Sequence, residues 1–147
     1  MKSFLNFIVS PSISIDWLVF VRVFIGILIM RHAIDLFDAS QMRIVATGFE
    51  AMHIPLPGIM AYISKLAEFF GGLLLVIGLF THITAAILVF NMFVAVWAAF
   101  GFNIFKGELA FLYLLLFVVF ATLGGGKYSC DYLIFKRRVL DTPRPDK

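Results

Sequence analysis

The feature that most constrains this chain is an apolar segment, from Lys65 to Phe80, that carries a charge inside it. The stretch KLAEFFGGLLLVIGLF, with the residues before it, is long and apolar enough to cross a bilayer, yet it includes Glu68. A charge at the centre of a spanning helix costs about 2.5–3.5 kcal/mol, so such a residue is rare without a structural or functional purpose. The sequence therefore predicts a polar centre near Glu68.

The composition predicts a membrane protein. Of the 147 residues, 62% are hydrophobic and 14% charged, whereas soluble domains are about half apolar and about a quarter charged. The apolar residues concentrate in four long runs, which we interpret as membrane spans. The expected fold is an all-α transmembrane four-helix bundle, with spans at residues 16–34, 57–80, 83–102 and 108–123.

The first connection, residues 35–58, has an amphipathic pattern. Met42, Val45, Ala46 and Phe49 recur at helical spacing, which predicts a short interfacial helix that could cover the bundle.

The sequence divides the chain into three parts. Residues 1–14 hold an apolar run too short for a signal peptide, so they lie on the membrane surface or form a flexible terminus. Residues 15–135 form the four-helix domain, and residues 136–147 form a basic tail.

The distribution of Lys and Arg predicts the orientation. Four spans place both termini on one side, where seven of the twelve basic residues fall, against three on the other side. We expect the protein to lie in the inner membrane of the cell. The positive-inside rule then places both termini in the cytoplasm.

Several short motifs, taken in order, resemble those of the DoxX family of small four-helix membrane proteins. They are Arg22-x-x-x-Gly26, Glu68-x-x-Gly71-Gly72 with Gly78-Leu79, and Gly124-Gly125-Gly126-Lys127-Tyr128-Ser129-x-Asp131. The resemblance covers residues 15–135 and implies a four-helix transmembrane bundle associated with membrane redox chemistry. Relatives include the quinone-reducing membrane subunit of a thiosulfate oxidoreductase and a component of an oxidative-stress complex. The sequence departs from the pattern at Cys130, where an aliphatic residue is usual, and at His82, where an arginine often follows the threonine.

Arg22 and Glu68 are the first candidate site residues, because residue counting places both near mid-membrane. An arginine–carboxylate pair can be bidentate, which offsets the desolvation of both groups. Such a pair either fixes the packing of the first two helices or holds a polar ligand head, such as a quinone carbonyl, or relays a proton.

Four further residues are candidates for the same ligand site. Lys65 either pairs with Glu68 or snorkels outward, and snorkelling is the favoured interpretation. His32 is a solvated interfacial residue or a proton donor beside a quinone. Asn91 is an interhelical hydrogen-bond donor, or less favourably reaches Glu68. Glu108 starts the fourth predicted helix, where its negative charge interacts favourably with the positive end of the helix dipole. This interpretation is favoured over a catalytic role.

The sequence also argues against several functions. The three histidines have no ligand spacing, so we predict no metal site. The single cysteine, Cys130, excludes thiol–disulfide exchange within the chain. The basic excess sits mostly at the C-terminus, so nucleic acid is not an expected partner. No haem, flavin or dinucleotide motif is present, so the only cofactor considered is a quinone.

Three functions compete. The first is a redox-linked, quinone-interacting membrane subunit that receives electrons from a partner protein; the second is a non-catalytic assembly or stabilising subunit. The third is a small proton-linked transporter, which four helices could support only as a homo-oligomer. The sequence assigns no catalytic residue and leaves open whether the protein is an enzyme.

Overall fold

The computed structural model describes residues 17–101, 103 and 105–134, and all regular elements in these ranges are helices. The helices with defined bounds are α2 (Leu18–His32), the 3-10 helix η1 (Ala33–Phe37), α3 (Ala39–Ala51), α4 (Pro57–Ile77), α5 (Thr81–Phe100) and α6 (Glu108–Leu123). Residues 130–134 are also helical. The predictions for residues 1–14 and 136–147 lie outside the described residues.

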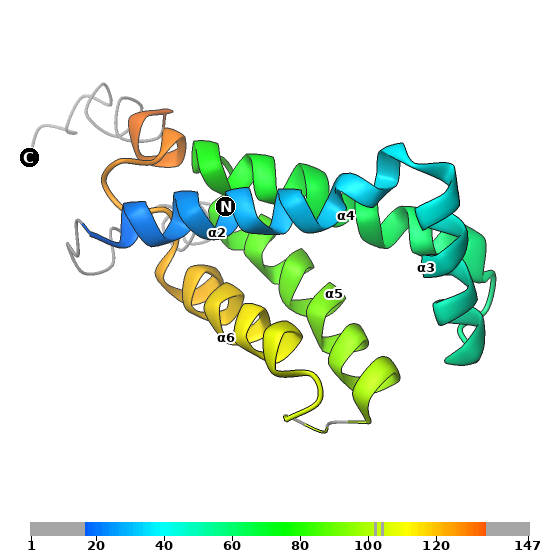
Figure 1. The fold of residues 1–147 in the computed structure, drawn as a ribbon. Helices are drawn as coiled ribbons and strands as arrows, with labels where there is room; N and C mark the ends of the chain where they lie inside the picture. Colours follow the sequence, from blue (N-terminus) through cyan, green and yellow to red (C-terminus); the bar gives the residue numbers. More distant parts are fainter. Residues whose placement is uncertain (1–16, 102, 104, 135–147) are drawn as a thin grey trace, which may run out of the picture.

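The long helices form two antiparallel hairpins (Figure 1). α2 packs along α4, and α5 packs along α6, while contacts between α4 and α5 join the two pairs. The hairpins meet near the α4–α5 turn and diverge toward the other end, where α3 and η1 cover α4. The all-helical prediction is confirmed for the described residues.

The α2–α4 contact depends on glycine. A Cβ atom on Gly26 would lie 2.8 Å from the carbonyl oxygen of Gly72, so the two backbones touch. On the adjacent position of α4, a Cβ on Gly71 would lie 3.0 Å from the Leu88 side chain of α5. Neighbouring helices therefore approach α4 closely at the glycine pair, with one glycine facing α2 and the other facing α5.

Left-handed glycines set two of the helix ends. Gly78 has φ 73° and ends α4 at Ile77, earlier than the predicted limit of residue 80. Gly101 has φ 53° and ends α5, which starts at Thr81 and not at residue 83. Glycine reaches this conformation without steric cost, which makes it a common helix stop.

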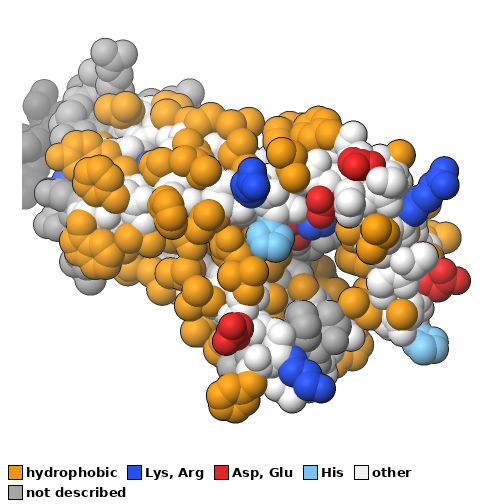
Figure 2. All heavy atoms as spheres, viewed as in Figure 1, with side chains coloured by type: hydrophobic (Ala, Val, Ile, Leu, Met, Phe, Trp, Pro, Cys, Tyr) orange, Lys and Arg blue, Asp and Glu red, His pale blue; other side chains and the backbone are white. Residues whose placement is uncertain are grey.

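Hydrophobic side chains cover much of the outside of the bundle (Figure 2). Phe20, Phe24 and Phe90 are each more than 60% exposed, whereas charged groups gather over α3 and at the far ends of α5 and α6. Among the described residues, α4 and the first 18 residues of α5 are long and apolar enough to cross a membrane. α2 and α6 have 15 and 16 residues, which corresponds to about 23–24 Å and is shorter than a hydrocarbon core of about 30 Å.

The predicted amphipathic helix of the first connection is present as α3. Met42 is buried, and Val45, Ala46 and Phe49 are partly buried, so the predicted face is the one that packs inward. Asp38 caps the helix by accepting a hydrogen bond from the Ser40 amide at 2.8 Å. Hydrogen bonds from Ser40 hold the pKa of the Asp38 carboxyl below its ordinary value.

Candidate functional site

A cavity of about 410 Å³ lies where the two hairpins diverge. Its volume falls in the range of about 300–1,000 Å³ that is typical of small-molecule sites. Apolar and ionisable side chains both line it, and they come from α2, α4, α5, α6 and the turn before α6. The lining residues are Ile29, His32, Glu68, Met92, Ala95, Lys106, Gly107, Glu108, Leu109, Ala110 and Tyr113.

Glu68 forms the polar wall of this cavity and is 6% exposed. One carboxylate oxygen accepts from the Lys65 ammonium at 3.0 Å, and the other accepts from the Asn91 amide at 3.2 Å. Lys65 also donates to the backbone carbonyl of His32 at 2.9 Å, which links the end of α2 to α4. The favoured prediction that Lys65 snorkels outward is wrong, because two acceptors within reach of its ammonium hold it beside Glu68.

Asn91 is an interhelical donor as predicted, and its acceptor is Glu68 itself. Both interpretations of Asn91 therefore hold, because its interhelical acceptor is the carboxylate at the polar centre. Together, Lys65, Glu68 and Asn91 form a hydrogen-bonded group that is close to neutral overall, which lowers the cost of placing a carboxylate among apolar helices.

The other ionisable groups lie nearer the mouth of the cavity. His32, Lys106 and Glu108 are exposed, and Glu108 occupies the first turn of α6, as predicted. Figure 2 shows a hollow between the arm formed by α5 and α6 and the rest of the molecule, with charged groups near its rim. The cavity thus has largely apolar walls, the buried Glu68 carboxylate and a charged mouth.

Tyr113 lines the cavity but is not among the site residues that the sequence predicted. It is 6% exposed and belongs to the buried face of α6 together with Phe117 and Phe120. These three residues recur at i, i+4 and i+7, a spacing that marks one helix face and could have revealed its inward position.

Arg22 does not belong to this cavity. Gly26 of α2 lies against Gly72 of α4, so Arg22 and Glu68 lie one turn beyond these glycines in opposite directions. The offset of eight residues corresponds to about 12 Å along the helices. The expected Arg22–Glu68 pair is therefore absent, because the antiparallel register, which residue counting does not reveal, separates the two side chains.

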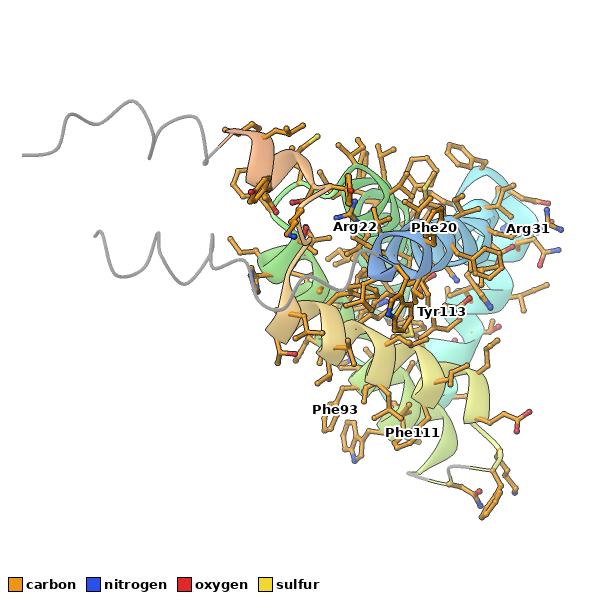
Figure 3. The ribbon with its side chains drawn as sticks, turned by 90° about the vertical axis from the view of Figure 1, so that its left-hand side faces the viewer. Phe20, Arg22, Arg31, Phe93, Phe111 and Tyr113 are labelled. Carbon is orange, nitrogen blue, oxygen red and sulfur yellow. The ribbon has the colours of Figure 1, made fainter. Side chains whose placement is uncertain are left out.

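Arg22 instead holds the segment that follows α6. Its guanidinium donates to the backbone carbonyl of Gly125 and, at 3.2 Å, to that of Tyr128. It is 2% exposed and touches Gly78 at the end of α4, which ties three elements together. Arg22 therefore contributes to packing, but through backbone carbonyls of the segment after α6 and not through the expected ion pair with Glu68 (Figure 3).

The same segment also closes the α4–α5 turn. Asp131 accepts from the amides of Phe80 and Thr81 at 2.7 and 2.9 Å, and its own amide donates to Gly78 at 3.0 Å. We call residues 124–131, with Arg22, the end clamp. His82 lies against it, with its Nδ1 atom 2.7 Å from the Ala121 carbonyl oxygen.

Comparison with known proteins assigns the family. A sequence model of the DoxX family matches residues 17–101, more than half of the chain. The chain belongs to the DoxX family. A search of curated proteins and one of solved structures each found no match.

The DoxX match covers α2 to α5 and so includes Arg22, His32, Lys65, Glu68 and Asn91, while Glu108, Tyr113 and most of the end clamp lie beyond it. Family membership and the two long apolar helices together support a membrane protein.

Proposed function

We propose that this DoxX protein is a redox-linked membrane subunit that binds the head group of a quinone in the cavity beside Glu68. The observation that carries the proposal is the cavity itself, which lies among apolar helices and contains a buried, hydrogen-bonded carboxylate. Buried ionisable groups in membrane helices mark ligand, ion or proton sites more often than packing alone would require.

The lining of the cavity fits a flat ring with polar edges. Ile29, Met92 and Leu109 supply apolar surface for a ring and the start of a tail, whereas His32 and Lys106 supply donors near the mouth. Quinone carbonyls accept hydrogen bonds, and small-molecule sites typically combine apolar walls with a few polar groups in this way. The quinone is a bound ligand here, and a partner protein supplies the electrons.

The arrangement of the helices suggests how such a ligand arrives. α6 packs mainly on α5, and the hairpin it forms diverges from α2 at the level of the cavity (Figure 1). A tailed ligand could therefore enter sideways from the lipid between α2 and α6.

The proposal includes four spans with both termini in the cytoplasm. The charge distribution supports this topology, as does the apolar exterior of α2 and α6, although these two helices are short. Single cysteines at Thr47 and Lys127, both exposed, on a Cys130→Ser background would test it in intact cells. A membrane-impermeant maleimide should label Thr47→Cys and not Lys127→Cys; the reverse pattern would refute the orientation.

The binding proposal is tested by measuring retained quinone. The protein is purified in mild detergent, transferred to nanodiscs containing decylubiquinone, and passed through gel filtration before mass spectrometry. Wild type should retain quinone above the level of empty nanodiscs, and Glu68→Gln should lose most of that excess, since the Lys65 ammonium loses its counter-ion in the cavity wall.

Glu50→Gln provides the matched control, because it makes the same chemical change on the exposed side of α3. If wild type retains no more quinone than empty nanodiscs, the binding proposal is wrong and a non-catalytic assembly subunit becomes the better interpretation.

A further inference from the structure

We propose that Tyr113 selects ligands that carry a hydrogen-bond acceptor, because its hydroxyl is a hydrogen-bond donor in the wall of the cavity. This inference rests on the proposed binding of quinone and specifies which residue recognises the ring carbonyl.

Tyr113 has an unusual combination of burial and unused hydrogen-bonding capacity. The residue is 6% exposed, yet within residues 17–101, 103 and 105–134 its hydroxyl has no hydrogen-bond partner. The hydroxyl is not among the fully enclosed polar atoms that lack a partner, so it keeps access to the cavity, where a ligand or a water molecule can accept its hydrogen bond. Since Tyr113 lines the cavity, its hydroxyl is available to whatever occupies that space.

The ring of Tyr113 is held from two sides. It stacks on Phe117 with centroids 5.9 Å apart and planes 21° apart, and it makes an edge-to-face contact with His32 at 5.9 Å and 86°. In Figure 3 the side chain extends from α6 toward α2, whereas Phe93 of α5 points away from the bundle. A fixed ring presents its hydroxyl without a further entropic cost on binding, which favours selective recognition.

The neighbouring polar groups are not placed to donate a hydrogen bond to a ligand inside the cavity. The Glu68 carboxylate only accepts hydrogen bonds when ionised, and Lys65 and Asn91 already occupy one of its oxygens each. The Lys65 ammonium in turn donates to Glu68 and to the His32 carbonyl, and neither Lys65 nor Asn91 is among the residues that line the cavity. His32 and Lys106 are exposed at the mouth, so the Tyr113 hydroxyl is the donor positioned to meet a ligand carbonyl deep in the cavity.

Tyr113→Phe tests the inference because it removes only the hydroxyl. The variant should keep its thermal stability, since no protein hydrogen bond is lost. Its affinity for decylubiquinone in nanodiscs, obtained from retained quinone at increasing loading, should fall roughly 10-fold, as expected for one hydrogen bond. Decylbenzene, which has the tail and ring but no oxygen, should compete equally well in both proteins. Tyr62→Phe, on the exposed outside of α4, is the matched control and should behave as wild type.

The outcomes separate this inference from the function on which it rests. If wild type binds no decylubiquinone, the proposed function fails and the role of Tyr113 falls with it. If wild type binds and Tyr113→Phe binds equally well, quinone binding stands and the inference is wrong. A variant that loses decylbenzene as strongly as decylubiquinone would also overturn it, because the change would then act through cavity shape and not through hydrogen bonding.

Discussion

Gly26 and Gly72 bring the backbones of α2 and α4 into direct contact. A Cβ atom on Gly72 would lie 2.7 Å from the Gly26 carbonyl oxygen, and one on Gly26 would lie 2.8 Å from that of Gly72. Each distance is shorter than real Cβ contacts allow, and the obstructing atoms belong to the backbone, which cannot turn aside as a side chain can. The register of the two helices is therefore fixed at this point.

Gly72→Ala should destabilise the protein by about 1–3 kcal/mol, the usual cost of forcing extra volume into a packed contact. Gly48→Ala is the control, because nothing lies within 4 Å of a Cβ there and the residue sits inside α3. That change should stabilise by about 0.4–1 kcal/mol through the unfolded state. Thermal unfolding in detergent measures both, and equal stability of the two variants would contradict the close contact.

The glycine contact also shows what the sequence could reveal about the fold. Helical elements, the amphipathic face of α3 and the small residues at a helix contact follow from local patterns of residues. The depth of Arg22 relative to Glu68 does not, because it depends on which turn of α2 faces which turn of α4. Only the packed structure, with Gly26 opposite Gly72, supplies that register.

A double-mutant cycle should confirm that Arg22 and Glu68 act independently. Arg22→Met leaves the Gly125 and Tyr128 carbonyls without their donor and should cost roughly 1.5–3 kcal/mol. Combined with Glu68→Gln, the losses should add within about 0.5 kcal/mol, as for sites more than about 7–10 Å apart.

The positive control for this cycle is Lys65→Met with Glu68→Gln. These side chains are 3.0 Å apart, so their effects should couple by about 0.5–3 kcal/mol. Strong coupling between Arg22 and Glu68 in the same thermal assay would show that the two residues meet after all.

The candidate site could be predicted in part. The charge of Glu68 inside an apolar run identified the polar centre, and His32, Lys65, Asn91 and Glu108 prove to lie at or beside the cavity. Tyr113 was missed because an aromatic residue in an apolar helix fits a lipid-facing belt as well as a core. Its role depends on a cavity formed by three other elements, which no single segment encodes.

Asp131 should contribute to stability through the α4–α5 turn. Asp131→Ala removes both acceptors from the Phe80 and Thr81 amides and should cost about 0.5–2 kcal/mol, by analogy with other helix caps. Asp131→Asn keeps one carbonyl oxygen and loses the charge at the α5 N-terminus, so its loss should be smaller. Circular dichroism melting curves would compare the three proteins, and an unchanged midpoint for Asp131→Ala would argue against the cap.

The first turn of α3 should respond to acid through Asp38. Its pKa is below the ordinary value of 3.8, chiefly because the Ser40 side chain and amide donate to the carboxylate. A carboxyl whose pKa is lower in the folded state stabilises above its unfolded pKa and loses that effect as the pH falls through the folded pKa. The protection factor of the Ser40 amide, which corrects the exchange rate for its intrinsic dependence on pH, should therefore fall relative to pH 6 as the pH drops through the folded pKa of Asp38.

Asp38→Asn is the control for that experiment, because its side chain does not titrate in this range. The extra loss of protection at low pH should disappear in the variant. The same acid-dependent loss in both proteins would assign the effect to another group.

The end clamp has a consequence for how the chain is made. Asp131 accepts a hydrogen bond from the Thr81 amide at the start of α5, although it lies 50 residues further along the sequence. The α4–α5 turn therefore leaves the ribosome long before Asp131 is translated. The α4–α5 turn therefore lacks this partner until residues 124–131 have been made. Arg22, which is synthesised earlier still, cannot donate to the Gly125 and Tyr128 carbonyls before then. Closure of the clamp is therefore possible only after α6 has been translated, so a closed clamp reports that synthesis has passed the end of this helix.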